Sequence, residues 1–262
     1  MAGILLTAFG ATAPNGTAPL LAFERAVRRA FPAANVRWAF TSKRADTRPV
    51  IRDETGLSVG EALSRFAAEN TARIAVQPLH VTDGHEHETL RQQIGTWQKD
   101  HPGATVFLGE PLLSGEASFR TLLEAMRRAE ETACAPGEAA LWVGHGSEPP
   151  LDGLCKRLAD CGAAMRPPVR VAYLIDGKTA EEHFRELARQ GAQKVCLMPL
   201  FSLAGRHVAQ DLDGEAAASW KSRCVHAGMP CRVHPRGMLE DDGFTTLWLA
   251  RLRDAVAMAD AQ

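Results

Sequence analysis

The sequence has few aromatic residues and almost no net charge. Phe, Trp and Tyr together make up 6% of the 262 residues, so aromatic platforms for stacked nucleobases are not expected. The formal net charge is −1, with 30 Lys and Arg against 31 Asp and Glu, which gives no basic field for a polyanion. Apolar runs also stay well below the roughly 18 residues that a membrane span needs. We therefore expect neither a nucleic-acid partner nor a membrane segment.

Paired-cysteine motifs and a secretory signal are also missing. None of the six cysteines forms a C-x-x-C pair, and the N-terminus lacks the cationic and long apolar regions of a signal peptide. We interpret the cysteines as reduced and structural, which is typical of a reducing compartment. The sequence therefore predicts a cytoplasmic protein.

Several motifs of common enzyme classes are absent. The chain contains no Gly-x-Gly-x-x-Gly, no phosphate-binding P-loop, no Gly-x-Ser-x-Gly and no His-Glu-x-x-His. A nucleotide cofactor, a nucleophile elbow and a zinc-protease helix are therefore not expected.

Eight short apolar runs alternate with amphipathic segments along the chain. The runs are nearly continuous, as expected for strands that are covered on both faces of a parallel sheet. They are Ile4–Phe9, Val36–Thr41, Arg73–Leu79, Thr105–Leu108, Ala140–Val143, Arg170–Leu174, Lys194–Leu200 and Cys231–Val233. This alternation predicts an α/β fold.

The two halves of the sequence resemble each other. The segment 74–86, which ends in Gly84-x-Glu86, matches the segment 195–207, which ends in Gly205-x-His207. Ser-x-x-Glu at 58–61 and Thr-x-x-Glu at 179–182 are capping boxes in corresponding positions. Chance similarity between Ala-rich segments is the alternative. We infer two βαβαβα lobes, 1–131 and 138–262, joined near 135–137, with a cleft between them.

Two histidines follow predicted strands of the second half. His145 lies between Gly144 and Gly146 after one strand, and His207 follows another by a short loop. Because carboxyl ends of parallel strands meet at one edge of a sheet, we expect these imidazoles to approach each other. They would bind a first-row divalent metal or accept a proton. Two ordinary surface histidines are the alternative.

The first half offers charged residues at equivalent places. Glu86 corresponds to His207 in the repeat, where it would accept a proton or help a metal to enter the site. The neighbouring His85 and His87 have a poor spacing for a chelate. The segment 41–52 is basic and contains Lys43 and Arg44, which suit an anionic ligand, although a solvated loop has the same composition.

A set of motifs, taken in order, resembles the sirohydrochlorin cobaltochelatases of the anaerobic pathway. The similarity spans nearly the whole chain, and its order and spacing are more specific than any single motif. The motifs are Ile4–Gly10, Phe40-Thr41-Ser42, Gln77-Pro78-Leu79-His80 with Gly84-x-Glu86, Val143-Gly144-His145-Gly146, and Leu197–Leu200 with Ala204-Gly205-x-His207, followed by Asp211, Ser219-Trp220-Lys221 and Ala227-Gly228.

This resemblance implies a class II chelatase fold, with two pseudo-symmetric flavodoxin-like lobes and a central cleft. It implies insertion of Co²⁺ into sirohydrochlorin without ATP, with His145 and His207 as metal ligands and bases for the pyrrole protons. The metal would be a substrate, with no permanently bound cofactor, and family members form homo-oligomers. The expected substrate-binding residues are Phe9, Gly10, Thr41, Ser42, Lys43, Arg44 and Glu86.

One position departs from the family pattern. Relatives carry a metal-binding Glu after the strand that matches Arg170–Leu174, whereas this sequence reads Leu174-Ile175-Asp176. Asp176 supplies the carboxylate if the alignment shifts by one residue.

Two other functions remain open besides Co²⁺ insertion. They are Fe²⁺ insertion, which would give sirohaem, and a tetrapyrrole or metal carrier without catalysis.

Overall fold

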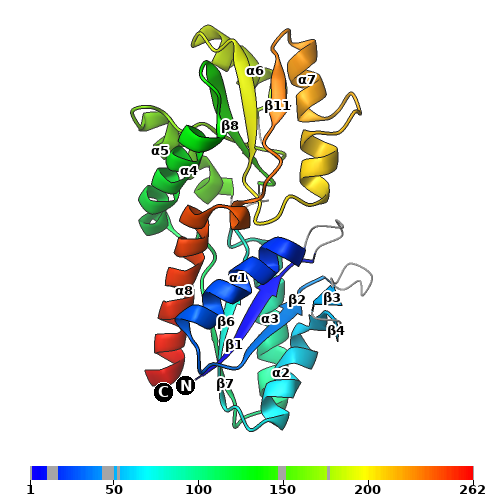
Figure 1. Cartoon of the computed structure of the whole chain (residues 1–262), viewed down its shortest axis with the longest axis vertical. Coiled ribbons are helices and arrows are strands. Elements are labelled where there is room, and N and C mark those ends of the chain that lie inside the picture. Colours follow the sequence, from blue (N-terminus) through cyan, green and yellow to red (C-terminus); the bar gives the residue numbers. More distant parts are fainter. Residues whose placement is uncertain are drawn as a thin grey trace. The chain divides into compact units, whose positions relative to one another are not determined.

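The structure, a computed structural model, describes residues 2–10, 17–42, 50–51, 54–146, 152–175 and 178–261. Contacts divide the chain into two compact units (Figure 1), of which the first comprises Met1–Ser114 and Phe244–Gln262 and the second Gly115–Gly243. Each unit contains a parallel sheet with helices packed against it. The predicted α/β class with two parallel sheets is confirmed.

The sheet of the first unit has the strand order β5-β2-β1-β6-β7, and every neighbouring pair is parallel. All six residues of the central strand β1 are buried, as expected for a strand covered on both faces. The strands are β1 (Gly3–Ala8), β2 (Val36–Phe40), β5 (Leu57–Ser58), β6 (Arg73–Pro78) and β7 (Thr105–Leu108), and a separate antiparallel pair is formed by β3 (Val50–Ile51) and β4 (Glu54–Thr55). The helices are α1 (Thr17–Ala30), α2 (Val59–Ala68), α3 (His85–Asp100) and α8 (Asp242–Ala261).

The sheet of the second unit has the order β11-β10-β8-β9 and is also parallel throughout. Its strands are β8 (Glu138–Gly144), β9 (Val171–Tyr173), β10 (Lys194–Pro199) and β11 (Cys231–Val233). The helices are α4 (Phe119–Ala133), α5 (Asp152–Ala164), α6 (Ala180–Arg189) and α7 (Trp220–His226), with the short turns η2 (Glu116–Ser118), η3 (Val208–Leu212) and η4 (Met238–Glu240).

The two sheets share a topology, which supports the predicted repeat. The order β2-β1-β6-β7 in the first unit corresponds to β9-β8-β10-β11 in the second. Both predicted capping boxes are formed, because Ser58 Oγ accepts from the amide of Glu61 and Thr179 Oγ1 accepts from the amide of Glu182. All eight predicted strands are present; two have the predicted bounds, and the ends of the other six differ by at most two residues.

The compact units differ from the predicted lobes 1–131 and 138–262 by two helices. α4 groups with the second unit, where Trp142 Nε1 donates to Glu130 Oε1 at 2.8 Å. α8 groups with the first unit, where the amide of Ala2 donates to Asp260 Oδ1 at 2.9 Å. The boundaries differ because a helix belongs to the unit against which its apolar face packs, whereas the predicted lobe boundaries followed the order of the chain.

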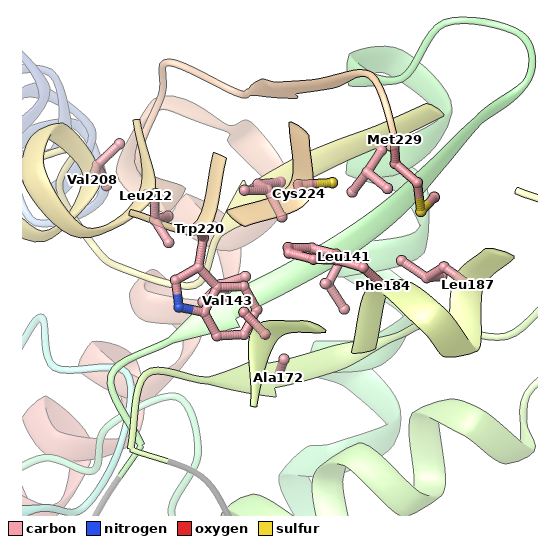
Figure 2. Close-up of a cluster of buried hydrophobic side chains, with 13 residues drawn as sticks. Leu141, Val143, Ala172, Phe184, Leu187, Val208, Leu212, Trp220, Cys224 and Met229 are labelled. Atoms are coloured by element: carbon pink, nitrogen blue, oxygen red, sulfur yellow. The ribbon is translucent and has the colours of Figure 1, made fainter. Parts of the chain in front are cut away.

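A cluster of buried side chains fills one face of the second sheet (Figure 2). Leu141 and Val143 from β8 pack with Phe184 from α6 and Trp220 from α7, and the two aromatic rings meet edge to face at 6.0 Å. Truncating a buried Phe to Ala costs about 3–5 kcal/mol of stability. This core holds β8 and β10, the strands that precede His145 and His207.

Candidate functional site

His145 follows β8 directly, and the residues after the neighbouring strand β9 donate hydrogen bonds to the backbone around it. The amide of Leu174 donates to the carbonyl of Gly144 at 2.8 Å, and the amide of Ile175 donates to the carbonyl of His145 at 3.0 Å. Gly146 has a φ of +84°, and a Cβ there would lie 2.6 Å from the carbonyl oxygen of Ile175. Only glycine fits this close approach in the left-handed region. The exposed His145 side chain is therefore carried on a well-defined turn.

His207 precedes the π-helical turn η3, which follows β10. Its ring lies 5.0 Å from that of His145, centroid to centroid, with an angle of 68° between the planes. The predicted approach of the two imidazoles is thus present within the second unit.

Two further side chains hold the His207 ring. Asp211 Oδ2 lies 2.6 Å from His207 Nδ1, and Phe201 stacks on the ring at 5.6 Å with an angle of 10°. Because a carboxylate only accepts hydrogen bonds, the tautomer of the neutral ring that this contact favours has its proton on Nδ1 and its lone pair on Nε2. Asp211 therefore orients the ring so that Nε2 is the nitrogen accessible to a metal ion or a proton.

The spacing of the two rings suits a shared metal ion. Metal–nitrogen bonds of about 2.0–2.1 Å at right or tetrahedral angles place two imidazole centroids roughly 4.5–5.2 Å apart. The observed 5.0 Å falls in that interval. Among the described residues, no third His, Cys, Asp or Glu forms a three-donor group with this pair.

Asp176, the predicted third ligand, lies outside the described residues, but its neighbour is placed. Ile175 is 50% exposed and bonded through its amide to the carbonyl of His145. The chain therefore passes beside His145 one residue before Asp176.

Four of the predicted substrate-binding residues lie together at the carboxyl ends of β1 and β2 in the first unit. The amide of Thr41 donates to the carbonyl of Ala8 at 3.0 Å, and that of Ser42 donates to the carbonyl of Phe9 at 3.0 Å. Thr41 and Ser42 are buried, and Gly10 follows Phe9. Phe9, in contrast, is 52% exposed. Lys43 and Arg44 lie outside the described residues.

Glu86 lies in the first turn of α3, with an exposed carboxylate 3.9 Å from His80 Nε2. Burial lowers the pKa of His80 to about 3, so this imidazole is neutral at physiological pH. Burial also lowers the pKa of His87, whose ring meets His80 edge to face at 6.0 Å. His85 on the same helix is exposed, so the poor chelating spacing expected for His85 and His87 is present in the structure.

Sequence reasoning missed three partners in these regions. The His207–Asp211 pair is separated by four residues, a spacing that a helical interpretation of the segment makes detectable. The stacking of Phe201 on His207 and the contact of His80 with His87 join a loop to a helical turn. No periodic pattern in the sequence indicates such contacts.

A comparison with known protein families shows to which of them the chain belongs. The model of the family described as cobalt chelatase (CbiK) matches residues 2–257. The chain belongs to the cobalt chelatase (CbiK) family. It is therefore a metal chelatase, as the sequence predicted.

Curated relatives match almost the whole chain. It is 33% identical over 258 residues to the sirohydrochlorin cobaltochelatase CbiKC of Nitratidesulfovibrio vulgaris, covering 98% of this chain and 92% of the relative. It is 27% identical over 243 residues to the sirohydrochlorin cobaltochelatase of Salmonella typhimurium, covering 92% and 90%.

Solved structures confirm the fold. SirB from Bacillus subtilis with Fe³⁺ matches with a TM-score of 0.70 at 16% identity, covering 100% of this chain and 98% of SirB. The predicted chelatase fold is therefore confirmed for this cobalt chelatase family member. No described helix of it has the length and apolar character that crossing a membrane requires.

Proposed function

We propose that this chelatase inserts Co²⁺ into sirohydrochlorin without ATP, in the cytoplasm. The observation that carries the proposal is the pair of imidazoles 5.0 Å apart, one of which is oriented by a carboxylate. Membership of the cobalt chelatase family and the 33% identical sirohydrochlorin cobaltochelatase support the choice of metal and macrocycle.

The proposed exchange of ions is balanced in charge and does not require ATP. Sirohydrochlorin loses two pyrrole protons as a divalent cation enters, so the charges of the ions exchanged are equal. The side chain of His145 and Nε2 of His207 first bind Co²⁺. Imidazole nitrogens are donors of intermediate softness, which suits transfer of a first-row metal to the macrocycle. As the metal moves to the macrocycle, the same nitrogens become free to take the protons.

Roles for the remaining predicted residues follow from their chemistry. Asp176 completes the metal ligands, and Glu86 takes a proton or passes the metal. The exposed ring of Phe9, with Gly10, Thr41 and Ser42, contacts the macrocycle, and Lys43 and Arg44 bind its carboxylates. The metal is a substrate, no cofactor is permanently bound, and the enzyme is a homo-oligomer without a nucleic-acid or membrane partner.

The proposal is tested by following the absorbance of sirohydrochlorin with Co²⁺ and the full chain, in the absence of nucleotides. We expect acceleration over the spontaneous rate, no gain on adding ATP, and loss of turnover in His145→Ala. His226→Ala is the matched control, because this exposed imidazole binds only its own helix, through the carbonyl of Ser222 among the described residues. Tight tetrapyrrole binding without acceleration would show a carrier instead.

Metal preference needs a separate comparison. Parallel assays with Co²⁺ and Fe²⁺ at equal free concentrations, under anaerobic conditions, give the ratio of kcat/KM for the two metals. A ratio in favour of Co²⁺ supports the proposal, and a ratio in favour of Fe²⁺ assigns the protein to sirohaem formation.

A further inference from the structure

Two cysteines and a glutamate meet at the amino-terminal end of the second sheet. The thiol sulfurs of Cys134 and Cys196 and a carboxylate oxygen of Glu138 all lie within 4.8 Å of one another. Cys134 ends α4, Glu138 begins β8, and Cys196 is a buried residue of β10. In the described part of the chain, this is the one group of three metal-binding side chains.

The cluster is separate from the histidine pair. Glu138 begins β8 and His145 follows its other end, so seven residues of extended chain place them roughly 23 Å apart. A metal ion bound at one end of β8 therefore shares no ligand with an ion at the other.

The donor atoms suit a tetrahedral metal centre. With metal–sulfur bonds of about 2.3 Å and metal–oxygen bonds of about 2.0–2.2 Å, neighbouring donors of a zinc ion lie roughly 3.5–3.8 Å apart. The present separations, at most 4.8 Å, need only a small contraction. Cys134 is partly exposed, which gives an ion access, and a fourth position remains for water.

Glu138 can bind a metal without giving up its existing partners. Its Oε2 accepts from Arg232 Nη2 at 2.6 Å and from the amide of Ala135 at 2.8 Å, which uses both lone pairs. Its Oε1 accepts from Arg232 Nε at 2.8 Å, so that a second lone pair stays available among the described contacts. Arg232 also donates to the carbonyl of Ala133, which fixes the end of α4 beside the carboxylate.

The charges indicate a divalent ion. Two thiolates, one carboxylate and the Arg232 guanidinium sum to −2, which a divalent cation neutralises. Two thiolates with a carboxylate suit a thiophilic, tetrahedral ion better than Mg²⁺ or Ca²⁺, which prefer oxygen donors only. A neutral, partly buried site has the lowest desolvation cost.

We propose that Cys134, Cys196 and Glu138 form a second metal site, which binds a divalent cation of the zinc type. Its ligands join the end of α4 to β8 and β10. Because α4 comes from the first half of the sequence but packs in the second unit, the ion fastens this helix to the sheet on which it lies. Binding therefore stabilises the second unit and leaves the histidine pair free for the substrate metal.

The test uses the full chain, reduced and freed of metal, and titrated with Co²⁺ alone under anaerobic conditions. Co²⁺ bound to thiolates gives a sulfur-to-cobalt charge-transfer band, whereas the histidine pair supplies nitrogen only. We expect this band at one equivalent, and its loss on adding Zn²⁺, which binds such sites more tightly than Co²⁺. Cys134→Ser and Glu138→Gln each remove a direct ligand, so each should weaken Co²⁺ binding by more than the roughly 10–100-fold that the loss of an outer partner of a ligand costs.

The chain offers a matched control in a second thiol pair. Cys224, whose sulfur is seen in Figure 2, and Cys231 interact on the opposite face of the sheet, with no third donor beside them among the residues that the structure describes. Cys231→Ser should keep the charge-transfer band, and Zn²⁺ should slow alkylation of Cys134 but not of the exposed Cys161.

Three results would overturn the proposal: no charge-transfer band in the folded wild-type chain, a band that persists in Cys134→Ser, or a Cys134–Cys196 disulfide in protein kept under reducing conditions. Circular dichroism of each variant shows that it is folded. If Cys134→Ser does not fold, Glu138→Gln, which keeps both thiols, decides the assignment by its weaker binding.

Discussion

His207 Nδ1 and Asp211 Oδ2 lie 2.6 Å apart at the start of the turn that follows β10. The carboxylate fixes the proton on Nδ1 and the ring orientation, so that Nε2 is the nitrogen available for chemistry. Asp211 does not need to touch the substrate metal for this effect. We treat it as a positioning residue that acts through His207.

Asp211→Asn should lower kcat of Co²⁺ insertion roughly 10–100-fold, because the amide does not hold one tautomer of His207. The affinity for sirohydrochlorin should stay unchanged, because Asp211 acts through the His207 ring and not on the macrocycle. The control is Asp213→Asn, which removes an exposed ion pair with Lys221 at 2.6 Å. An unchanged kcat in Asp211→Asn, or activity lost only through a lower Tm, contradicts the positioning role.

Gly146→Ala should destabilise the protein more than Gly191→Ala does. Both glycines have a positive φ, +84° and +88°, but only at Gly146 does a Cβ meet the carbonyl oxygen of Ile175, at 2.6 Å, while the space at Gly191 is open. The difference in free energy of unfolding should be about 1–3 kcal/mol. Denaturant unfolding of both variants measures it, and equal losses would mean that backbone conformation alone matters at Gly146.

The strands were predictable because each is a nearly continuous apolar run between polar segments, as in Lys194–Leu200. The placement of α4 and α8 was not predictable. An amphipathic pattern shows that one face of a helix is buried, but it does not show which sheet covers that face. β5, with two residues, is too short for a periodic signal.

The candidate site was predictable where it depends on strand ends. His145 and His207 follow the adjacent strands β8 and β10, so their approach follows from the parallel sheet. The contact between Cys134 and Cys196 was not predictable, because it joins the end of a helix to a strand far along the sequence. Such contacts depend on how helices pack across a sheet, which no local pattern specifies.

Glu130→Gln should stabilise the protein at alkaline pH and have little effect at acidic pH. Burial raises the pKa of Glu130 to about 7, and its carboxyl accepts from Trp142 Nε1 at 2.8 Å. Between an ordinary pKa of about 4.5 and the raised value, the folded state binds more protons than the unfolded state, so stability falls as pH rises. The neutral amide removes this loss, which is on the order of 1–3 kcal/mol.

Chemical denaturation of Glu130→Gln and wild type at pH 5 and pH 8 checks this prediction. The control is Glu131→Gln, whose carboxylate is exposed and pairs with Arg127 at 2.7 Å. A stabilisation of equal size at both pH values would show that the raised pKa of Glu130 is not the cause.

His80→Leu should protect the first unit against acid. Burial lowers the pKa of His80 to about 3, and neither ring nitrogen has a hydrogen-bond partner in the described structure. From an ordinary pKa of about 6.5 down to the lowered value, the unfolded state binds the extra proton, so stability falls as pH decreases through this window. The apolar variant has no proton to bind at this position, so it avoids this loss of stability, which is on the order of several kcal/mol below the lowered pKa.

The measurement is the free energy of unfolding of His80→Leu and wild type from pH 7 to pH 4. We expect the difference in free energy of unfolding between the variant and the wild type to change in favour of the variant as the pH falls, whatever its sign at pH 7. His85→Leu is the control, because this imidazole lies on the same segment but is exposed. Parallel pH curves for wild type and His80→Leu would mean that the buried ring accepts its proton without opposing the fold.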